Sequence, residues 1–598
     1  MSRRSLEALR YFLGRYAALA VTLLGVLVLS AALEGLTAAA LFPFVSVVVG
    51  QGMEGRGGPF LQVLQRTING IPVQDKVIAA TLFLITIVTL KGGTVLTREA
   101  LIAYGGARIV HEAKRTLLSR LANAPYIFYL RSQGKKVNDL HYQLSMAPQS
   151  LGAVLLLLPY VVMQLFTIIV IVALLFSIDW QLTLFIGLAG LGIYAVIGAV
   201  SQRVSYAAGK GQVEALSKEH GVIREFLQGF REIVVARAAS FWVGRVEAES
   251  DRFRRLYVRD LTWQAMPSVI IETSFFVVVC GLVVIYRWQT GGASQGLLPT
   301  MAVYAYAVYR LVGSISVFSR QALKMNSKLP DVELLYEAIR TVPRQSLDEG
   351  RGEAAMSQRI AFDRVAFTYP DRAELALRDI TFEIRKGVVT AIIGASGSGK
   401  STIVNLVMRL LDPTSGRILV DGQDLTAFNR DAWLRRIGYV GRESFLFNGT
   451  IEENIRFGLS SPSREAVEYA ACVAQAHEFI VKLPQGYETE VGERGLILSD
   501  GQRQRLAIAR AILRNPEILI FDEGMSALDN LSEALIQKAI ADLARDHTVV
   551  LVAHRLSTVR FADQIVVLDR GRVVEVGKHD ELLARKGQYS LMMASSGE

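Results

Sequence analysis

Eight residues at Gly394–Ser401 have the types and spacing needed to hold phosphate groups. The stretch reads GASGSGKS and fits the pattern GxxxxGK[ST]. Glycines let backbone N–H groups curl around a phosphate, and a following helix adds the partial positive charge of its N-terminus. Lys400 would reach the outer phosphates and the Ser401 hydroxyl would ligate Mg²⁺. The sequence therefore predicts an ATP and Mg²⁺ site, with these candidate residues: Gly394, Ser396, Gly397, Gly399, Lys400, Ser401 and Thr402.

Two adjacent carboxylates follow an apolar run that ends at Phe521. At the end of a buried strand, Asp522 would hold Mg²⁺ through water, and Glu523 would act as the general base that polarises the attacking water. Taken alone, an ordinary strand that ends in two acids explains this segment equally well.

The elements around these residues are those of an α/β domain. From residue 359 onward, short β-rich runs alternate with helical patterns. A strand over 388–393 and a helix over 402–411 would flank the phosphate loop, which is the context that such a loop needs. A polar stretch at 341–357 is typical of a linker. We therefore expect a nucleotide-binding domain over 358–598.

The first part of the chain has the composition of a membrane domain. The 598 residues are 51% hydrophobic and 20% charged with two Cys, which excludes disordered, collagen-like and disulfide-rich classes. The runs 151–178 and 180–202 carry no charge, and each is long enough to cross a bilayer. Four less uniform runs bring the expected number of spans to six: 16–49, 77–104, 261–286 and 297–323. We expect a six-helix domain over 1–340.

The net charge of +10 is unevenly distributed. Up to residue 340 there are about 33 Lys and Arg against about 20 Asp and Glu, whereas the remainder is slightly acidic. The basic excess gathers at the N-terminus and in the segments 108–143 and 203–260, which the positive-inside rule places in the cytoplasm. Both termini and the nucleotide-binding domain should then be cytoplasmic. A basic excess confined to the apolar part argues against nucleic acid as a partner.

The segment 498–510 reads LSDGQRQRLAIAR and resembles the LSGGQ signature of the ATP-binding cassette (ABC) family. With six expected spans before one cassette, the whole chain resembles a half-transporter of the type I exporter architecture. The resemblance implies a polytopic all-α transmembrane domain fused to an α/β P-loop NTPase domain. It also implies ATP hydrolysis coupled to transport across the bacterial inner membrane.

The resemblance assigns further residues one at a time. Tyr369 matches the aromatic residue that stacks on adenine, Asp529 belongs to the D-loop, and His554 matches the switch histidine that contacts the γ-phosphate. Ser499, Gly501 and Gln502 belong to the signature, which in the family closes the nucleotide site of the opposing cassette. The family's coupling segments correspond to 124–136 and 223–233.

One cassette in the chain implies a dimer with two shared nucleotide sites, formed with a second copy or with a related half-transporter. Glu523 and His554 favour a competent homodimer. Two departures from the family pattern favour a catalytically weak subunit that depends on a partner: Asp500 replaces a signature glycine, and Arg442 stands where the family has the Q-loop glutamine. Both interpretations remain open on the sequence.

Four cations fall within or beside the expected spans: Lys91, Arg98, Arg287 and Arg310. Charges inside a membrane domain are costly and often face a cavity, which would suit an amphiphilic substrate with an anionic head. Internal pairing, or snorkelling to the interface, explains them equally well. The stretches FPFVSV at 42–47 and LPDVELLY at 329–336, with a possible outer helix at 60–68, resemble bacterial lipid-linked oligosaccharide flippases. Other lipids, including lipid A-like molecules, and drugs or peptides are the alternative substrates.

Overall fold

The computed structural model consists of two compact units. The first comprises Met1–Ala124 and Ser132–Arg344, and the second comprises Pro125–Arg131 and Gln345–Glu598. The structure describes residues 3–48, 63, 66–68, 70–73, 75–132, 136–178, 180–290, 298–343, 352, 355–370, 372–442, 444–492, 495–522, 530–553 and 559–595. Most of the expected outer helix at 60–68 therefore lies outside the described residues, and the domain boundaries at 340 and 358 stay predictions.

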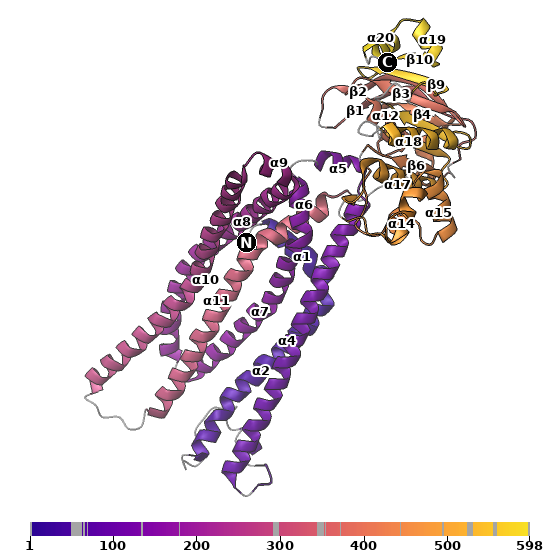
Figure 1. Cartoon of the computed structure of the whole chain (residues 1–598). Helices are drawn as coiled ribbons and strands as arrows, with labels where there is room; N and C mark the ends of the chain where they lie inside the picture. The colour runs from indigo at the N-terminus through magenta and orange to yellow at the C-terminus, as the bar shows by residue number, and fades with distance from the viewer. Residues whose placement is uncertain are drawn as a thin grey trace. The chain divides into compact units, whose positions relative to one another are not determined.

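Long helices make up most of the first unit (Figure 1). Each of the six longest corresponds to one expected span: α2 (Ala17–Val48), α4 (Lys76–Ala122), α7 (Ala147–Ile178), α8 (Trp180–Gln228), α10 (Ala239–Thr290) and α11 (Leu298–Thr341). Three shorter helices are α1 (Arg3–Arg15), α6 (Lys136–Ser145) and α9 (Phe230–Val235). Apolar runs form helices in a membrane because the backbone must satisfy its hydrogen bonds internally.

Two of the described helices are long and apolar enough to cross a membrane by length and composition. They are α4, with a mean hydropathy of 1.8 in its most apolar window, and α7, with 2.6. Helices α1 and α2 would supply a third span if they are taken together across their bend of 87°. Among the described residues, these helices are the clearest candidates for spans.

Buried carboxylates connect the long helices to one another. Asp331 of α11 accepts hydrogen bonds from the Tyr142 hydroxyl of α6, at 2.8 Å, and from Ser150 of α7. Asp260 of α10 accepts one from the Ser205 hydroxyl of α8, at 2.6 Å. Burying a carboxylate is costly unless it is hydrogen-bonded, so these contacts help to select how the helices pack.

The second unit contains two β-sheets. A four-stranded sheet has the order β2-β1-β4-β5, and a six-stranded sheet has the order β10-β9-β3-β8-β7-β6. The strands are β1 (Arg359–Thr368), β2 (Leu375–Arg385), β3 (Val389–Gly394), β4 (Ser415–Val420), β5 (Gln423–Asp424), β6 (Ile437–Val440), β7 (Ile518–Asp522), β8 (Thr548–Val552), β9 (Gln564–Asp569) and β10 (Arg572–Gly577).

Helices and short turns fill the remainder of this unit. They are α5 (Tyr126–Ser132), whose residues up to Arg131 belong to this unit, α12 (Lys400–Val407), α13 (Arg430–Arg435), α14 (Ile451–Arg456), α15 (Arg464–Val473), α16 (His477–Val481), α17 (Asp500–Ile512), α18 (Asn530–Leu543), α19 (His579–Ala584) and α20 (Gln588–Ser595). Two 3₁₀ turns are η1 (Leu425–Ala427) and η2 (Gly486–Glu488). An all-helical membrane-type unit joined to an α/β unit is the expected fold class.

The six-stranded sheet is buried on both faces. Along β3, Ala391 and Ile393 belong to one hydrophobic cluster, and Ile392 belongs to another. The strands β6, β7, β8, β3 and β9 run parallel, whereas β10 is antiparallel to β9. Because both faces are covered, these strands are near-continuous apolar runs, and polar groups can gather only at the strand ends.

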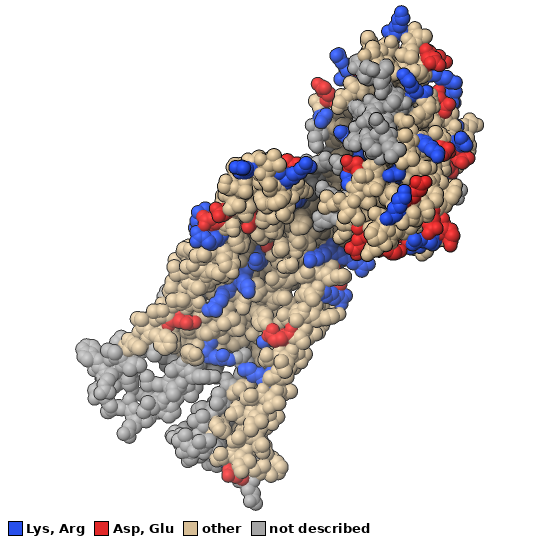
Figure 2. Space-filling model, in the orientation of Figure 1, with Lys and Arg blue, Asp and Glu red and all other residues tan. Residues whose placement is uncertain are grey.

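The surfaces of the two units differ in charge. On the face shown in Figure 2, acidic and basic side chains are interspersed over the second unit. The first unit shows long stretches without charge on that face, with few Lys, Arg, Asp or Glu between them. This contrast follows the split between an apolar part and a polar part that the composition predicts.

Candidate functional site

The phosphate loop lies between β3 and α12. Gly394 ends the strand with φ of +154°, and Gly399 precedes the helix with φ of +106°, both within a region that favours glycine. A Cβ on Gly394 would lie 2.3 Å from the Leu568 carbonyl oxygen, and one on Gly399 would lie 2.5 Å from Leu377 Cδ2. Both positions therefore need glycine for backbone conformation and for space.

Lys400 begins α12 and turns its amine back into the loop. Its Nζ donates to the carbonyl oxygens of Gly394, at 2.7 Å, and Ala395, at 3.1 Å. The residue is only 4% exposed, whereas Ser396, Gly397 and Ser401 around it are exposed. A buried ammonium, a helix N-terminus and an exposed hydroxyl therefore meet in one loop, a set of donors that suits the phosphates of a nucleotide.

Tyr369 lies beside the same helix. It follows β1, and its hydroxyl is 3.0 Å from Thr402 Oγ1 in the first turns of α12. The ring of Phe367 meets its ring edge to face, with centroids 4.9 Å apart. The structure thus places the predicted adenine-stacking residue next to the phosphate loop, and the stacking itself stays a prediction.

Asp522 reaches the edge of the sheet from which the phosphate loop starts. Val552 of β8 pairs with Ile392 of β3 on one side and with Asp522 of β7 on the other. β7 therefore ends level with Ile392, two residues before the end of β3, with one strand between them. A hydroxyl and a carboxylate at a shared edge are ligands that Mg²⁺ prefers, so Ser401 and Asp522 fit the predicted ion. Three further predicted residues, Glu523, Asp529 and His554, lie outside the described residues.

The signature segment forms the start of α17. Ser499 caps the helix: its side chain accepts from the Gln502 N–H at 3.3 Å, and the Gln502 Oε1 accepts from the Ser499 N–H at 3.0 Å. Gly501 is buried in the first turn, and Asp500 forms an ion pair with Arg503. An acidic residue in the first turn is favourable to the helix dipole, which explains locally why an aspartate is tolerated there.

The phosphate loop and the signature pack on different cores. Helix α12 packs its buried side chains into the cluster that contains Trp433 and Phe362, whereas α17 packs into the cluster that contains Tyr487 and Leu506. The two halves of the predicted site therefore rest on different parts of the cassette.

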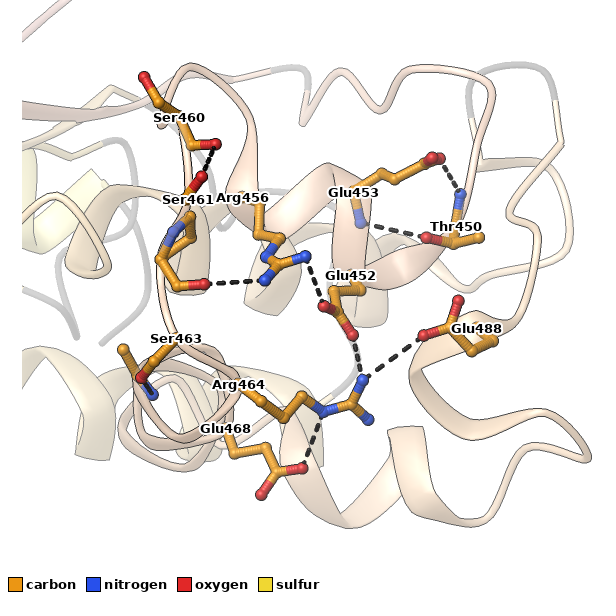
Figure 3. A network of polar contacts seen from close by, with 12 residues as sticks. Thr450, Glu452, Glu453, Arg456, Ser460, Ser461, Ser463, Arg464, Glu468 and Glu488 are labelled. Carbon is orange, nitrogen blue, oxygen red and sulfur yellow. Dashed lines mark hydrogen bonds and ion pairs between the residues drawn. The ribbon is translucent and has the colours of Figure 1, made fainter.

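An ion-pair network supports the helices near the signature (Figure 3). The Glu452 side chain of α14 is 10% exposed and lies between Arg456, at 2.8 Å, and Arg464 of α15. Arg464 also pairs with Glu468 at 3.0 Å and with Glu488 of η2 at 3.5 Å. Glu452 thus joins α14 to α15, and Arg464 extends the network to η2.

An aromatic residue completes the network. The guanidinium of Arg464 lies 4.5 Å from the centroid of the Tyr487 ring. Burial raises the pKa of Tyr487 to about 12, so its phenol keeps its proton and contacts His477 Nδ1 at 2.8 Å. Backbone hydrogen bonds from Ile451 to Thr489 and from Val491 to Gly449 join the same segments. The two loops that flank α14 and η2 are therefore held together.

The first predicted coupling segment contains α5. Its Tyr126, Ile127 and Leu130 pack against the core of the nucleotide-binding unit. The second predicted segment corresponds to the end of α8 and the start of α9 in the first unit.

The four predicted membrane cations have different surroundings. Arg98 of α4 has a side chain that is 12% exposed and pairs with Glu99 at 2.8 Å. The Tyr160 hydroxyl donates to the same carboxylate at 2.6 Å, and the guanidinium lies over the Tyr160 ring. Arg98 is thus internally paired, as one of the two sequence interpretations holds. Lys91 and Arg310 are half-buried in α4 and α11, and the Arg287 side chain lies outside the described part.

Sequence reasoning missed two residues of this region. Glu452 becomes significant only through contacts across α14, α15 and η2. Tyr439 of β6 donates its hydroxyl to Asp522 Oδ2 at 3.4 Å, from a strand far away in sequence. The Ser499–Gln502 capping box, in contrast, has a local signal, because Ser followed three residues later by Gln is a known helix start.

Both units match families of known proteins. Residues 23–305 match the ABC transporter transmembrane region, and residues 377–526 match the ABC transporter family. An ATP-dependent lipid A-core flippase of Methylococcus capsulatus is 32% identical over 546 residues, which cover 90% of this chain and 89% of that protein. One from Methylobacillus flagellatus is 32% identical over 486 residues, or 81% of each chain.

Further similarities extend the comparison. A Bacillus subtilis protein whose name assigns it provisionally to multidrug export is 30% identical and covers 82% of this chain and 84% of its own. The solved structure of a bacterial Atm1-family ABC exporter with ATP bound superimposes with a TM-score of 0.78 at 26% identity, covering 98% of this chain and 99% of the other. The chain belongs to the ABC transporter family: it is a half-transporter of the type I exporter architecture that couples ATP hydrolysis to transport across a membrane.

Proposed function

We propose that this chain flips an amphiphile whose lipid carries a phosphate- or pyrophosphate-linked glycan, and that it works as a homodimer in the bacterial inner membrane. The observation that carries the proposal is the similarity to lipid A-core flippases, which extends over nine-tenths of the chain and so includes both units. A glycan head is too polar to cross the hydrocarbon unaided, so its transfer requires a protein path, and ATP can make the movement directional.

Two substrates of this class are in competition. A polyprenyl-pyrophosphate glycan, the lipid-linked oligosaccharide, is favoured by the stretches at 42–47 and 329–336. A lipid A-core glycolipid is the second candidate, because the similar proteins of Methylococcus and Methylobacillus carry that name. Both have phosphate groups that half-buried Lys91 and Arg310 are suited to attract.

The separation of the phosphate loop from the signature favours a dimer. Each chain supplies one phosphate loop and one signature, packed on different cores. A second copy would place its Ser499, Gly501 and Gln502 over the nucleotide held by the first. Because the chain also carries Glu523 and His554, two identical copies would supply two complete sites.

Each proposed site residue has a definite task within the site. Tyr369 orients the base, and the loop from Gly394 to Thr402 holds the phosphates, with Lys400 providing fixed positive charge. Ser401 and Asp522 would hold Mg²⁺, which neutralises the charge that develops on the phosphates. Glu523 accepts a proton from the attacking water, and His554 and Asp529 contact the nucleotide from neighbouring loops.

The orientation in the membrane follows from charge. We place both termini and the nucleotide-binding unit in the cytoplasm, because the basic segments 108–143 and 203–260 belong there by the positive-inside rule. The loops at 50–75, 179 and 287–296 would then face the other side.

Arg442→Gln is expected to raise ATP turnover several-fold. At a distance of 4 Å and an effective dielectric of 20, Mg²⁺ would repel the Arg442 guanidinium by about 8 kcal/mol, so we expect the side chain to turn away. The Arg442 side chain is exposed in the structure. A glutamine at this position would place a neutral group there. The measurement is steady-state ATPase of the reconstituted chain; unchanged turnover and unchanged coupling to transport would refute this account of Arg442.

The substrate proposal is tested by stimulation of ATPase in nanodiscs that contain only this chain. We expect a polyprenyl-pyrophosphate glycan to increase turnover more than lipid A or a cationic drug does. Stronger stimulation by lipid A would favour the second candidate. An inactive monomer would instead indicate a subunit that depends on a partner.

A further inference from the structure

Tyr439 connects two neighbouring strands at the edge of the sheet where the proposed Mg²⁺ site lies. Its backbone pairs with Ile520, so β6 and β7 run parallel with Asp522 two residues further along. The Tyr439 side chain points towards Asp522, and its hydroxyl donates to Asp522 Oδ2 at 3.4 Å. Tyr439 is 46% exposed, so it is not a core residue.

Gly441 makes this orientation of the ring possible. A Cβ at residue 441 would lie 2.9 Å from the Tyr439 hydroxyl oxygen and 3.0 Å from Cε1. Such separations are too short for an ordinary side chain, so any residue other than glycine would displace the ring. The φ angle of Gly441 lies outside the left-handed region, and the glycine is therefore required for space alone.

The surroundings of Tyr439 include α5 as well as Asp522. Burial raises the pKa of the Tyr439 phenol, and the nearby Asp522 carboxylate and Tyr126 phenol raise it further. The hydroxyl is a neutral group that donates to the Asp522 carboxylate. Tyr126 itself packs on the core of the nucleotide-binding unit.

We propose that Tyr439 is a positioning residue that fixes the Asp522 carboxylate for Mg²⁺. The proposal rests on the role of Asp522 proposed above. Residues that hydrogen-bond a metal ligand fix its orientation and strengthen metal binding. A neutral hydroxyl can orient the carboxylate without repelling Mg²⁺, whereas a guanidinium such as that of Arg442 would repel the ion. Tyr439 of β6, with the space that Gly441 leaves just after the strand, would thus position Asp522 independently of the residue at 442.

Metal affinity tests the proposal directly. The dissociation constant of Mn²⁺, with a non-hydrolysable ATP analogue saturating, is measured by electron paramagnetic resonance on the full chain in detergent. We expect Tyr439→Phe and Gly441→Ala each to raise it about 5- to 10-fold, the lower part of the range for such residues. The double variant should be no weaker than either single variant, because both remove the same hydrogen bond.

Three comparisons make the outcome decisive. Tyr469→Phe, at an exposed tyrosine of α15, should leave Mn²⁺ affinity unchanged, and melting temperatures should confirm that the variants fold. If Asp522→Asn weakens Mn²⁺ binding but Tyr439→Phe stays within about twofold of the parent, the role of Tyr439 is overturned. If Asp522→Asn itself has no effect, the proposed metal site is wrong and the inference falls with it. Additive losses in the double variant would overturn the part assigned to Gly441.

Discussion

Lys400→Ala is expected to reduce ATP turnover at least about 100-fold, equivalent to about 2.7 kcal/mol of transition-state stabilisation. The Lys400 amine lies inside the loop on the carbonyl oxygens of Gly394 and Ala395, and the residue is almost completely buried. Fixed positive charge at this point stabilises the charge that develops on the transferred phosphoryl group without reorganisation. The measurement is steady-state phosphate release by the purified, reconstituted chain.

Lys482→Ala is the matched control for this variant. Lys482 is an exposed residue at the end of α16, away from the loop, and its loss should leave turnover unchanged. If Lys400→Ala retained more than about half of the parent turnover while ATP was saturating, the charge of Lys400 would not be needed in the transition state. The assignment of this loop as the phosphate site would then be contradicted.

Glu452→Ala is expected to destabilise the nucleotide-binding unit by about 2 kcal/mol. Its carboxylate is largely buried between Arg456 and Arg464. Breaking a buried ion pair costs about 3–5 kcal/mol, but both arginines are more than one-third exposed, so water screens them and reduces the loss. For a unit of this size the melting temperature should fall by about 4–8 °C. Thermal unfolding of the full chain in detergent, followed with and without nucleotide, measures the shift.

Glu468→Ala provides the comparison for Glu452→Ala. Glu468 contacts the same Arg464, at 3.0 Å, but its side chain is 43% exposed. Its loss should therefore cost no more than about 0.5 kcal/mol. Equal shifts for the two variants would show that the network does not depend on the buried carboxylate.

Local patterns predicted most of the fold. The expected strand at 388–393 corresponds to β3, and the expected spans each correspond to one long helix, because hydrophobic runs of these lengths leave few other structures. The phosphate loop was predictable because its residues are contiguous and glycine is required where φ is positive. The helix expected at 402–411 is shorter, since α12 ends at Val407.

Contacts between distant segments could not be predicted in the same way. The hydrogen bond from Tyr439 to Asp522 depends on the register of β6 against β7, which is set by the whole sheet. The Glu452 network depends on three elements that meet only after folding. Arg98 is a different case: Glu99 is adjacent in sequence, but the packing of Tyr160 from α7 was needed to select internal pairing over a free cation.

The most direct test of the proposed function is ATP-dependent translocation of a labelled polyprenyl-pyrophosphate glycan in proteoliposomes that contain only this chain. We predict that the label crosses the bilayer with ATP and Mg²⁺, and that movement stops in the Lys400→Ala variant. Absence of movement, while lipid A or another lipid crosses in the same vesicles, would contradict the substrate that we favour. Absence of movement for every amphiphile tested would contradict a homodimeric flippase.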